Sequence, residues 1–468
     1  MVRIYNTLTR QKEEFKPLKE GKVGIYSCGP TVYDYFHIGN ARPFIVFDLL
    51  RRYLRYRNYE VVFVQNFTDI DDKMIRRAEE RKISFRELAA EMIDAYYEDA
   101  AALGIEKADR HPRATEFIPQ MIELINKLLE KGAAYTAGGN VYFSVESFKE
   151  YGKLSRQSLQ DLFAGARVEV GEAKRYAGDF ALWKQAKPGE PFWESPFGPG
   201  RPGWHIECST MAMAFLGDTI DIHGGGPDLI FPHHENEIAQ SEAATGVTFA
   251  RYWMHVGYLN INEEKMSKSA GNFLTVRELR QIYDPLVIRF FMLSSHYRNP
   301  INFNSELIEQ AGKGLARLRT MVENLEDMLA KMPPQEVTTA SDNLGGKVEE
   351  AREAFISKMD EDLNTAEGIG VLFDLAREVN TYLNAPGPKN RNSMEQALRF
   401  YREADDVLGF IFPPQKGSLE EDINLLIEKR EEARRLKDWA KADAIRAQLA
   451  GKGILLEDTP HGVRWRKK

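Results

Sequence analysis

One set of side chains in this sequence has the chemistry of metal ligands. Cys28 and Cys208 supply thiols, and the segment HHENE at 233–237 supplies imidazoles and carboxylates. Residues four positions apart on a helix project from the same face, so His233 and Glu237 could hold one ion together. The two cysteines could as well be inert buried thiols, and the histidine-rich segment could be a solvated helix start. Spacing alone leaves both interpretations open.

A second group of polar side chains lies in the segment Tyr33–Arg42, which contains His37, Gly39 and Asn40. The first turn of a helix presents unpaired N–H groups and a partial positive charge. His37 and Asn40 placed there would add donors for phosphate oxygens, and Gly39 would leave room for a flat ring against the backbone. In isolation the segment favours a plainer interpretation, in which Asn40 only caps the helix and His37 lies on the surface.

Two lysines, Lys265 and Lys268, lie three positions apart among small and polar residues in the segment 264–272. A mobile loop of this composition could bring ammonium groups to a polyphosphate as charge develops on it. Taken alone, the segment could also be an ordinary surface turn.

The neighbouring residues predict the elements that must position these groups. Val23–Ser27 predict a strand, a helix is expected to begin near Asn40, and Val61–Val64 predict a second strand. Strand, helix and strand within about 40 residues form a βαβ unit and begin a parallel sheet. Ligands of such sheets bind outside the carboxyl ends of the strands. We therefore expect Cys28 and the segment 66–69 to face the ligand.

The rest of the chain predicts further units. Loops rich in glycine, proline and charge indicate an insertion into the sheet, and amphipathic helices beyond Pro285 predict a bundle followed by a linker at 413–418. The expected fold class is α/β, with a Rossmann-like parallel-sheet domain, an insertion, a helical bundle and a small C-terminal α+β unit. The expected boundaries are 1–111 and 201–255 for the two halves of the sheet domain, 112–200 for the insertion, 256–305 for the lysine loop and the residues after it, 306–412 for the bundle and 419–468 for the last unit.

Composition narrows the classes of protein. The 468 residues carry a formal net charge of -7, so any contact with nucleic acid must come from local basic patches. Arg464–Lys468 is one candidate, although a solvated tail explains it equally well. Two cysteines are too few for a disulfide scaffold. Met1–Phe15 shows no signal or transit peptide, and no segment approaches the ~20 apolar residues of a membrane helix. We expect a cytoplasmic protein with no membrane role.

Together these segments resemble known families. KMSKS at 265–269 and the tetrapeptide HIGN at 37–40 resemble the paired ATP-binding motifs of class I aminoacyl-tRNA synthetases. A longer set of motifs, spread over essentially the whole chain, resembles the cysteinyl-tRNA synthetase family. These motifs are CGPTVYD at 28–34, TDIDDK at 68–73, GWHIEC at 203–208, HGGG at 223–226, FPHHENE at 231–237 and LEDTPHGVRW at 456–465.

The resemblance implies a role for each matching residue. It also implies that the sheet domain is catalytic, that 256–305 includes a stem-contact region and that 419–468 binds an anticodon. The implied residues are zinc ligands Cys28, Cys208, His233 and Glu237; cysteine-pocket residues Cys28, Thr68, Trp204 and His223; ATP-site residues His37, Gly39, Asn40, Asp228 and Lys268; and catalytic residues His37, Asn40, Lys265 and Lys268.

Two positions depart from the family's pattern. Asn40 stands where the general class I motif has a second histidine, and an amide can donate a hydrogen bond but cannot become cationic. Asn40 would therefore stabilise the transition state less than a histidine does, or another residue would supply that stabilisation. Ala270 stands where a larger apolar residue is expected, which we interpret as a packing variation.

The implied activity has two steps. The cysteine carboxylate attacks the α-phosphorus of ATP, giving cysteinyl-adenylate and pyrophosphate, and the 3′-terminal ribose of tRNA(Cys) then attacks the acyl carbon. Serine differs from cysteine by one atom, so shape discriminates poorly, whereas zinc bonds a thiolate strongly and an alcohol poorly. We therefore expect one Zn²⁺ per chain. The resemblance also implies Mg²⁺ with ATP, and a monomer is expected.

Two alternatives remain at this stage. One is a ligase that joins activated cysteine to a small amino-sugar, which the helices and basic residues at the end of the chain disfavour. The other is a non-catalytic RNA-binding paralogue, which the intact motifs disfavour.

Overall fold

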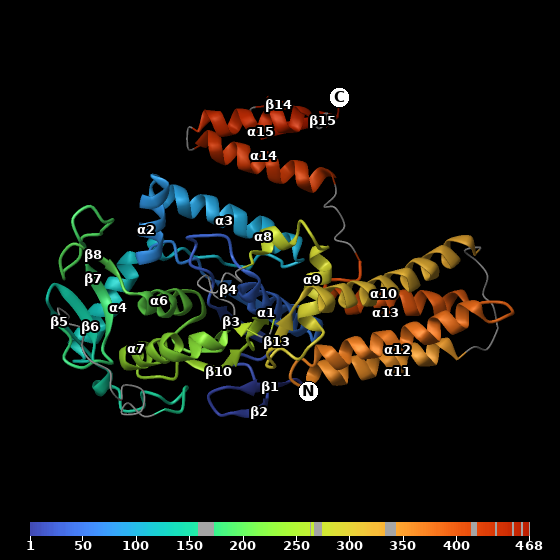
Figure 1. Ribbon diagram of the computed structural model, residues 1–468, viewed down its shortest axis with the longest axis horizontal. Coiled ribbons are helices and arrows are strands. Elements are labelled where there is room, and N and C mark those ends of the chain that lie inside the picture. The colour runs from blue at the N-terminus through green and yellow to red at the C-terminus, as the bar shows by residue number, and fades with distance from the viewer. Residues whose placement is uncertain are drawn as a thin grey trace. The chain divides into compact units, whose positions relative to one another are not determined.

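A computed structural model of the chain describes residues 1–157, 173–262, 264–265, 274–332, 343–412, 419–435, 438–451, 454–459 and 462–467. The chain divides into two compact units, Met1–Ile411 and Phe412–Lys468. The first unit contains the central sheet, the insertion and a helical bundle, and the second contains two helices and a hairpin (Figure 1).

The centre of the first unit is a four-stranded sheet with the order β10-β9-β3-β4, in which every neighbouring pair is parallel. The register places Tyr26 opposite both Val64 and His223, so strands from before and after the insertion pair directly. This confirms the predicted α/β class and βαβ unit. The strands are β3 (Lys22–Ser27), β4 (Glu60–Gln65), β9 (Ile220–Gly225) and β10 (Ala250–His255).

Helix α1 (Ile38–Tyr56) connects β3 to β4. Its apolar face is buried, as the spacing of Phe44, Phe47 and Leu50 predicts. The helix begins two residues earlier than Asn40, because the ring of His37 accepts a hydrogen bond from the Asn40 N–H and so forms the N-cap. The alternative in which Asn40 caps this helix is therefore wrong.

Two helices from the second half of the sheet domain bring further polar side chains to the sheet. Helix α6 (Trp204–Leu216) packs on β3 and β9, and α7 (Glu235–Thr245) packs on α6. A π-helical turn, Ile230–His234, leads into α7. Helices α2 (Asp72–Arg81) and α3 (Phe85–Ala102) follow β4 and pack on each other.

The insertion is an antiparallel sheet with the order β5-β6-β7-β8, accompanied by α4 (Ile118–Glu130), which packs on α6 and α7. Gly203 joins β8 to α6 where a Cβ atom would fall 1.9 Å from the Ala181 carbonyl oxygen, so only glycine fits. This close join fixes the start of α6. The strands are β5 (Ala134–Ala137), β6 (Asn140–Phe143), β7 (Phe180–Gln185) and β8 (Gly200–Pro202).

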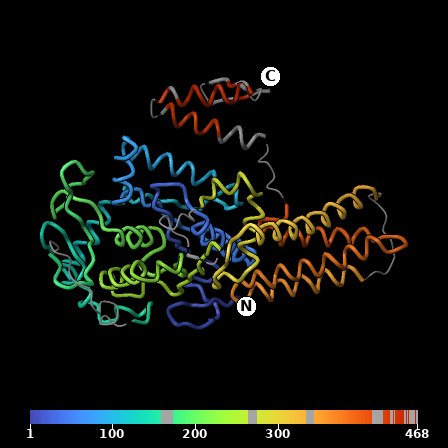
Figure 2. Tube along the Cα trace, viewed as in Figure 1, coloured from blue at the N-terminus to red at the C-terminus, as the bar shows by residue number. Residues whose placement is uncertain are grey.

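The helical bundle follows a short sheet in which β11 pairs with β12 and β13. In the bundle, α11 packs on α12 and α13, and α13 also packs on α1. Figure 2 shows the bundle as long parallel and antiparallel tubes at the end of the unit opposite the insertion. The elements are β11 (Leu259–Ile261), β12 (Glu264–Lys265), α8 (Val276–Leu279), α9 (Pro285–Leu293), β13 (Ile301–Phe303), α10 (Ser305–Lys331), α11 (Leu344–Asp360), α12 (Thr365–Asn384) and α13 (Arg391–Leu408). A hairpin of β1 (Arg3–Asn6) and β2 (Gln11–Glu14) precedes the sheet.

The second unit has the predicted α+β character. Its small core contains Ile445, Leu449 and Ile454. The predicted linker at 413–418 lies outside the described residues. Among the helices that the structure describes, none combines the length and apolar character needed to cross a membrane. The elements are α14 (Leu419–Arg435), α15 (Trp439–Gly451), β14 (Ile454–Thr459) and β15 (Gly462–Lys467).

Candidate active site

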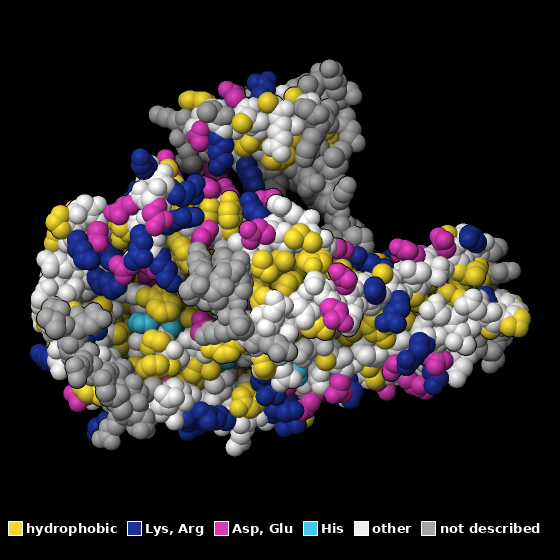
Figure 3. Space-filling view, viewed as in Figure 1, with side chains coloured by type: hydrophobic (Ala, Val, Ile, Leu, Met, Phe, Trp, Pro, Cys, Tyr) yellow, Lys and Arg dark blue, Asp and Glu magenta, His cyan; other side chains and the backbone are white. Residues whose placement is uncertain are grey.

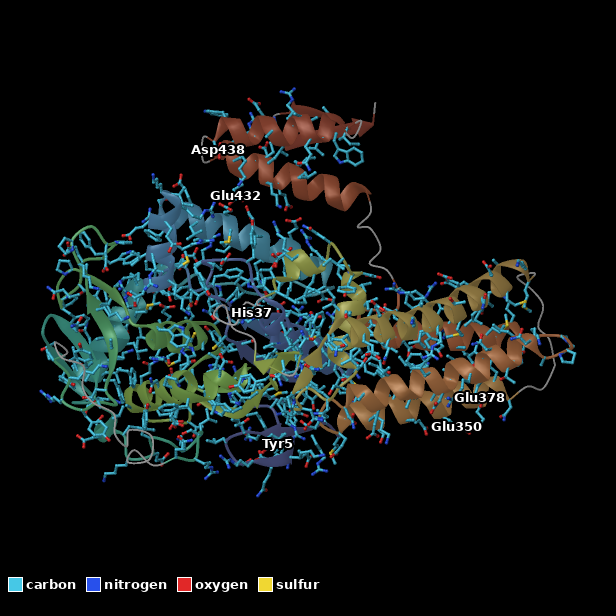
Figure 4. All side chains as sticks on the ribbon, in the orientation of Figure 1. Tyr5, His37, Glu350, Glu378, Glu432 and Asp438 are labelled. Atoms are coloured by element: carbon cyan, nitrogen blue, oxygen red, sulfur yellow. The ribbon has the colours of Figure 1, made fainter. Side chains whose placement is uncertain are left out.

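A cavity of about 380 Å³ opens at the carboxyl edge of the central sheet. Its walls are the residues after β3, the first turn of α1, the segment 226–229 and the segment 257–259. Figure 4 shows His37 at the start of α1, in the middle of the first unit. The predicted site residues that line the cavity are Cys28, His37, Gly39, Asn40, Trp204 and Asp228.

The four predicted metal ligands meet at one end of this cavity. Their ligand atoms all lie within 4.8 Å of one another, although they come from the residue after β3, from α6, from the π-helical turn and from α7. Cys28 Sγ lies 3.9 Å from Cys208 Sγ and 3.7 Å from Glu237 Oε1. His233 Nε2 lies 2.9 Å from the same Glu237 oxygen. Only Cys28 of the four also lines the cavity.

These separations suit a tetrahedral zinc ion. Bonds of about 2.3 Å to sulfur place two sulfur ligands about 3.8 Å apart, close to the distance between Cys28 and Cys208. Two thiols, an imidazole and a carboxylate are all donors that zinc accepts. The side chains of the cluster therefore fit the ion that the sequence predicts, and its binding stays a prediction.

Further side chains hold the cluster from behind. His223 Nε2 lies 2.8 Å from Glu237 Oε2, which leaves Oε1 to face the sulfur atoms. The Nδ1 atoms of His205 and His233 are 2.9 Å apart, and Gln240 donates to the His205 carbonyl at 2.6 Å. Such contacts orient metal ligands. His205 is not among the predicted site residues, although it lies in the GWHIEC motif.

The structure also offers an overlapping set of donors, Cys28, His223, His234 and Glu237. His234 Nε2 lies 3.3 Å from Cys28 Sγ, and its Nδ1 lies 2.8 Å from His255 Nε2. This set has one sulfur instead of two. Zinc therefore fits the set with Cys208 better, because a second soft thiolate strengthens its binding.

Burial and mutual charge shift the titration of the cluster. A hydrogen bond from the Cys28 thiol lowers the pKa of Cys208 to about 6. Burial alone would raise the pKa of Glu237, but the neighbouring His223 and His233 lower it to about 2. Burial opposes the charged form of His233, yet Glu237 and Cys208 raise its pKa to about 10. Cys208 and Glu237 are thus held ionised, whereas burial raises the pKa of Cys28, so a metal ion that bound here would displace protons from Cys28 and His233.

Trp204 connects the cluster to the cavity. Its ring stacks on the His233 ring with centroids 4.3 Å apart, and 42% of the residue is exposed. On the face shown in Figure 3, histidine and hydrophobic side chains gather side by side. Trp204 is therefore placed to contact a ligand that reaches the cluster.

The other two predicted cysteine-pocket residues do not line the cavity. Thr68 is buried and donates to Glu207 Oε2 at 3.0 Å, and His223 is fully buried against Glu237. Burial raises the pKa of Glu207 well above its usual range. The roles of Thr68 and His223 in cysteine binding stay predictions.

The opposite wall is the first turn of α1. His37 Nδ1 accepts from the Asn40 N–H at 3.2 Å, so in the neutral ring Nε2 carries the proton. The Ile38 N–H donates to the Leu274 carbonyl at 3.0 Å. His37 can therefore act as a donor at a helix N-terminus, where anions are favoured.

The lysine loop is anchored at the cavity by both of its ends. Lys265 ends β12, which pairs with β11, and Leu259 of β11 lines the cavity. Leu274 contacts the start of α1. Lys268 lies outside the described residues, as does the side chain of Lys265, so their contacts with phosphate stay predictions.

Comparisons with known proteins cover the whole chain. Residues 14–313 match the family described as tRNA synthetases class I (C) catalytic domain, 354–412 match the DALR domain, and 416–466 match the cysteinyl-tRNA ligase anticodon binding domain. The cysteine–tRNA ligase of Symbiobacterium thermophilum is 55% identical over 100% of this chain and 99% of its own length. That of Exiguobacterium sibiricum is 54% identical over 100% of both.

Solved structures share the fold at low identity. Methionyl-tRNA synthetase of Mycobacterium tuberculosis, bound by methionyl-adenylate, aligns with 85% of this chain and 96% of its own, with a TM-score of 0.63 and 16% identity. The Agrobacterium radiobacter K84 agnB2 LeuRS, in a ternary complex with tRNA and LeuAMS, covers 85% of both chains with a TM-score of 0.60 and 11% identity.

Proposed function

The chain belongs to the cysteine–tRNA ligase family of class I aminoacyl-tRNA synthetases, and from this premise we propose how its residues divide the reaction. Its activity is the ATP-dependent joining of cysteine to tRNA, as the sequence motifs predict. One observation carries the proposal for the site: Cys28 and His37 line the same cavity. Selection of sulfur and stabilisation of phosphate would therefore occur at two ends of one space.

Cys28, Cys208, His233 and Glu237 would hold zinc at the closed end. When bound there, zinc supplies a Lewis acid that favours a thiolate over an alcohol and so separates cysteine from serine. His205 contacts His233 Nδ1, and His223 contacts Glu237 Oε2. These contacts keep His233 and Glu237 oriented. Trp204 would form the wall along which the cysteine side chain enters, with Thr68 behind it.

The residues at the other end would stabilise charge during activation. The cysteine carboxylate attacks the α-phosphorus, and pyrophosphate leaves. Mg²⁺ bound with ATP would supply positive charge to the phosphates. His37 Nε2–H, the side-chain amide of Asn40 and the N–H groups of α1 would donate to phosphate oxygens. Lys265 and Lys268 would neutralise the departing pyrophosphate.

The nucleoside of ATP would lie beside the same helix turn. Gly39 lines the cavity and offers backbone without a side chain, which leaves space for the adenine ring. Asp228, in the short helix after β9, lines the cavity as well and would accept a hydrogen bond from the ribose.

The acceptor is tRNA rather than a small amino-sugar. The match of residues 416–466 to an anticodon binding domain supports this choice, and neither alternative finds support among the relatives. We propose that residues 419–468 bind the anticodon of tRNA(Cys) and that 256–305 contact its stem. A monomeric state and a cytoplasmic location also stay predictions.

An exchange assay tests the proposed function. ATP–pyrophosphate exchange should depend on cysteine and should be negligible with serine, and the enzyme should then charge tRNA that carries a cysteine anticodon. Exchange without charging would point to the small-molecule ligase. Absence of both activities would point to the non-catalytic paralogue.

A further inference from the structure

Arg42 lies one turn after His37 in α1, and its side chain is fully buried. Its Nη1 donates to the carbonyl oxygens of Gly257 and Tyr258 at 2.8 and 3.1 Å. Its Nη2 donates to the carbonyl oxygen of His296 at 3.2 Å. Among the residues that the structure describes, no carboxylate forms an ion pair with Arg42.

Burial of the Arg42 guanidinium without a carboxylate partner has a desolvation cost. Burial lowers the pKa of Arg42 to about 10, so the side chain stays protonated at neutral pH. A buried cation without an anionic partner depends on well-placed dipoles around it. The planar guanidinium presents its donors in a fixed geometry, so the three carbonyl groups must keep fixed positions relative to α1.

Two of these carbonyl groups belong to the wall of the cavity. Gly257 and Tyr258 line it on one side, and Gly39 and Asn40 line it from the helix that carries Arg42. The Gly257 backbone is closely packed, because a Cβ atom there would lie 2.5 Å from the Asn299 carbonyl oxygen. The segment that contains His296 is held in turn, since Arg298 Nε lies 2.8 Å from Asp362 Oδ2. Arg42 thus links the α1 wall of the cavity to the wall formed by Gly257 and Tyr258 and to the segment that contains His296.

We propose that Arg42 is a positioning residue for ATP. It sets the spacing between the first turn of α1 and the segment 257–259, and this spacing determines the fit of the nucleoside between them. The inference rests on the proposed function, in which ATP occupies this cavity. Arg42 itself does not line the cavity, so its effect passes through the backbone of Gly257 and Tyr258.

The test compares Arg42→Met and Arg42→Lys with Arg51→Met in the full-length protein. Arg51 lies on the same helix, is equally buried and donates to the carbonyls of Glu106 and Lys107, and it differs from Arg42 in that it also pairs with the Asp48 carboxylate at 2.5 Å. Neither Glu106 nor Lys107 lines the cavity. In pyrophosphate exchange, Arg42→Met should raise the KM for ATP by about tenfold while the KM for cysteine changes less than about twofold. Arg42→Lys should lie between, because an ammonium reaches fewer carbonyl groups.

The control separates positioning from stability. Arg51→Met should lower the thermal midpoint as Arg42→Met does but leave the KM for ATP unchanged. Equal effects of the two variants on that KM, equal rises in both KM values of Arg42→Met, or no change in either would overturn the proposal.

If the Arg42 variants do not fold, Gly257→Ala tests the same proposal. Gly257→Ala should displace the same backbone against Asn299 and raise the KM for ATP selectively, and an unchanged KM would count against the proposal. The proposed function would fail in a different way, since the unaltered protein would then show no cysteine-dependent exchange.

Discussion

The two ends of the cavity are built differently. At the sulfur end, Cys208, His233 and Glu237 are at most 2% exposed, and side chains from α6, α7 and β9 support them. At the phosphate end, the groups that line the cavity lie on the open first turn of α1, and the lysines belong to a segment whose two ends are anchored there. All four proposed metal ligands thus belong to the described fold, whereas the proposed phosphate end also takes Lys268, which lies outside the described residues.

This difference matches two requirements of cysteine activation, which are the selection of the substrate sulfur and the stabilisation of the leaving pyrophosphate. Discrimination between cysteine and serine depends on one atom, so the ligand geometry must exist before the substrate arrives. The charge on the leaving pyrophosphate appears only during the reaction, and a loop can supply ammonium groups at that moment. Variants at the sulfur end should therefore change metal content, whereas variants at the phosphate end should lower activity and leave metal content unchanged.

Cys208→Ser should have the largest effect and tests the sulfur end of the cavity. We expect zinc content to fall and cysteine-dependent exchange to drop by about a hundred- to a thousandfold, because the zinc that would bind the substrate sulfur loses one of its two thiolate ligands. Zinc per chain, measured by atomic emission, and exchange with cysteine and serine check this. Thr210→Val, two positions further along α6, is the matched control and should retain zinc, because the Thr210 hydroxyl donates to the Ile206 carbonyl of its own helix. A Cys208→Ser protein with full activity and intact cysteine preference would refute the metal assignment.

His37 tests the phosphate end with the next largest effect. His37→Ala and His37→Asn should both lower exchange by about a hundredfold, because each removes the Nε2–H donor. Asn is a good N-cap, so only His37→Ala should also lower the thermal midpoint. Zinc content should be normal in both variants. If His37→Asn kept full activity, the role of His37 would be to cap α1 and not to contact phosphate.

Substitution of His205, which contacts the proposed ligand His233, should have a smaller effect. His205→Ala removes the contact with His233 Nδ1 and should weaken zinc binding by about ten- to a hundredfold, measured by competition with a chelator. His111→Ala is the control, because His111 is partly buried against Phe67 and away from the cluster. Equal zinc affinities for the two variants would mean that His205 does not orient its neighbour.

Much of this organisation could be predicted from the sequence. Local apolar patterns predicted β3, α1 and β4, and the motif resemblance predicted which distant side chains would meet. The cap of α1 was predicted wrongly, because a histidine ring rather than the amide of Asn40 accepts the N–H. The contacts of His205 and Arg42 could not be predicted, since their partners, His233 and the carbonyls of Gly257 and Tyr258, become neighbours only in the folded chain.

His111 provides the last and smallest test, as a histidine that lacks the anionic partners of His233. Burial lowers the pKa of His111 to about 4, although the hydrogen bond with the Gln65 carbonyl opposes this shift. An unfolded histidine has a pKa of about 6.5, so below that pH the unfolded chain binds a proton that the folded chain does not. His111 should therefore destabilise the fold as the pH falls, by about 1 kcal/mol between pH 7 and pH 5.5. His111→Gln should reduce the change in the free energy of unfolding between these two pH values by that amount, measured by urea denaturation. An identical pH dependence in both proteins would show that burial does not control this side chain.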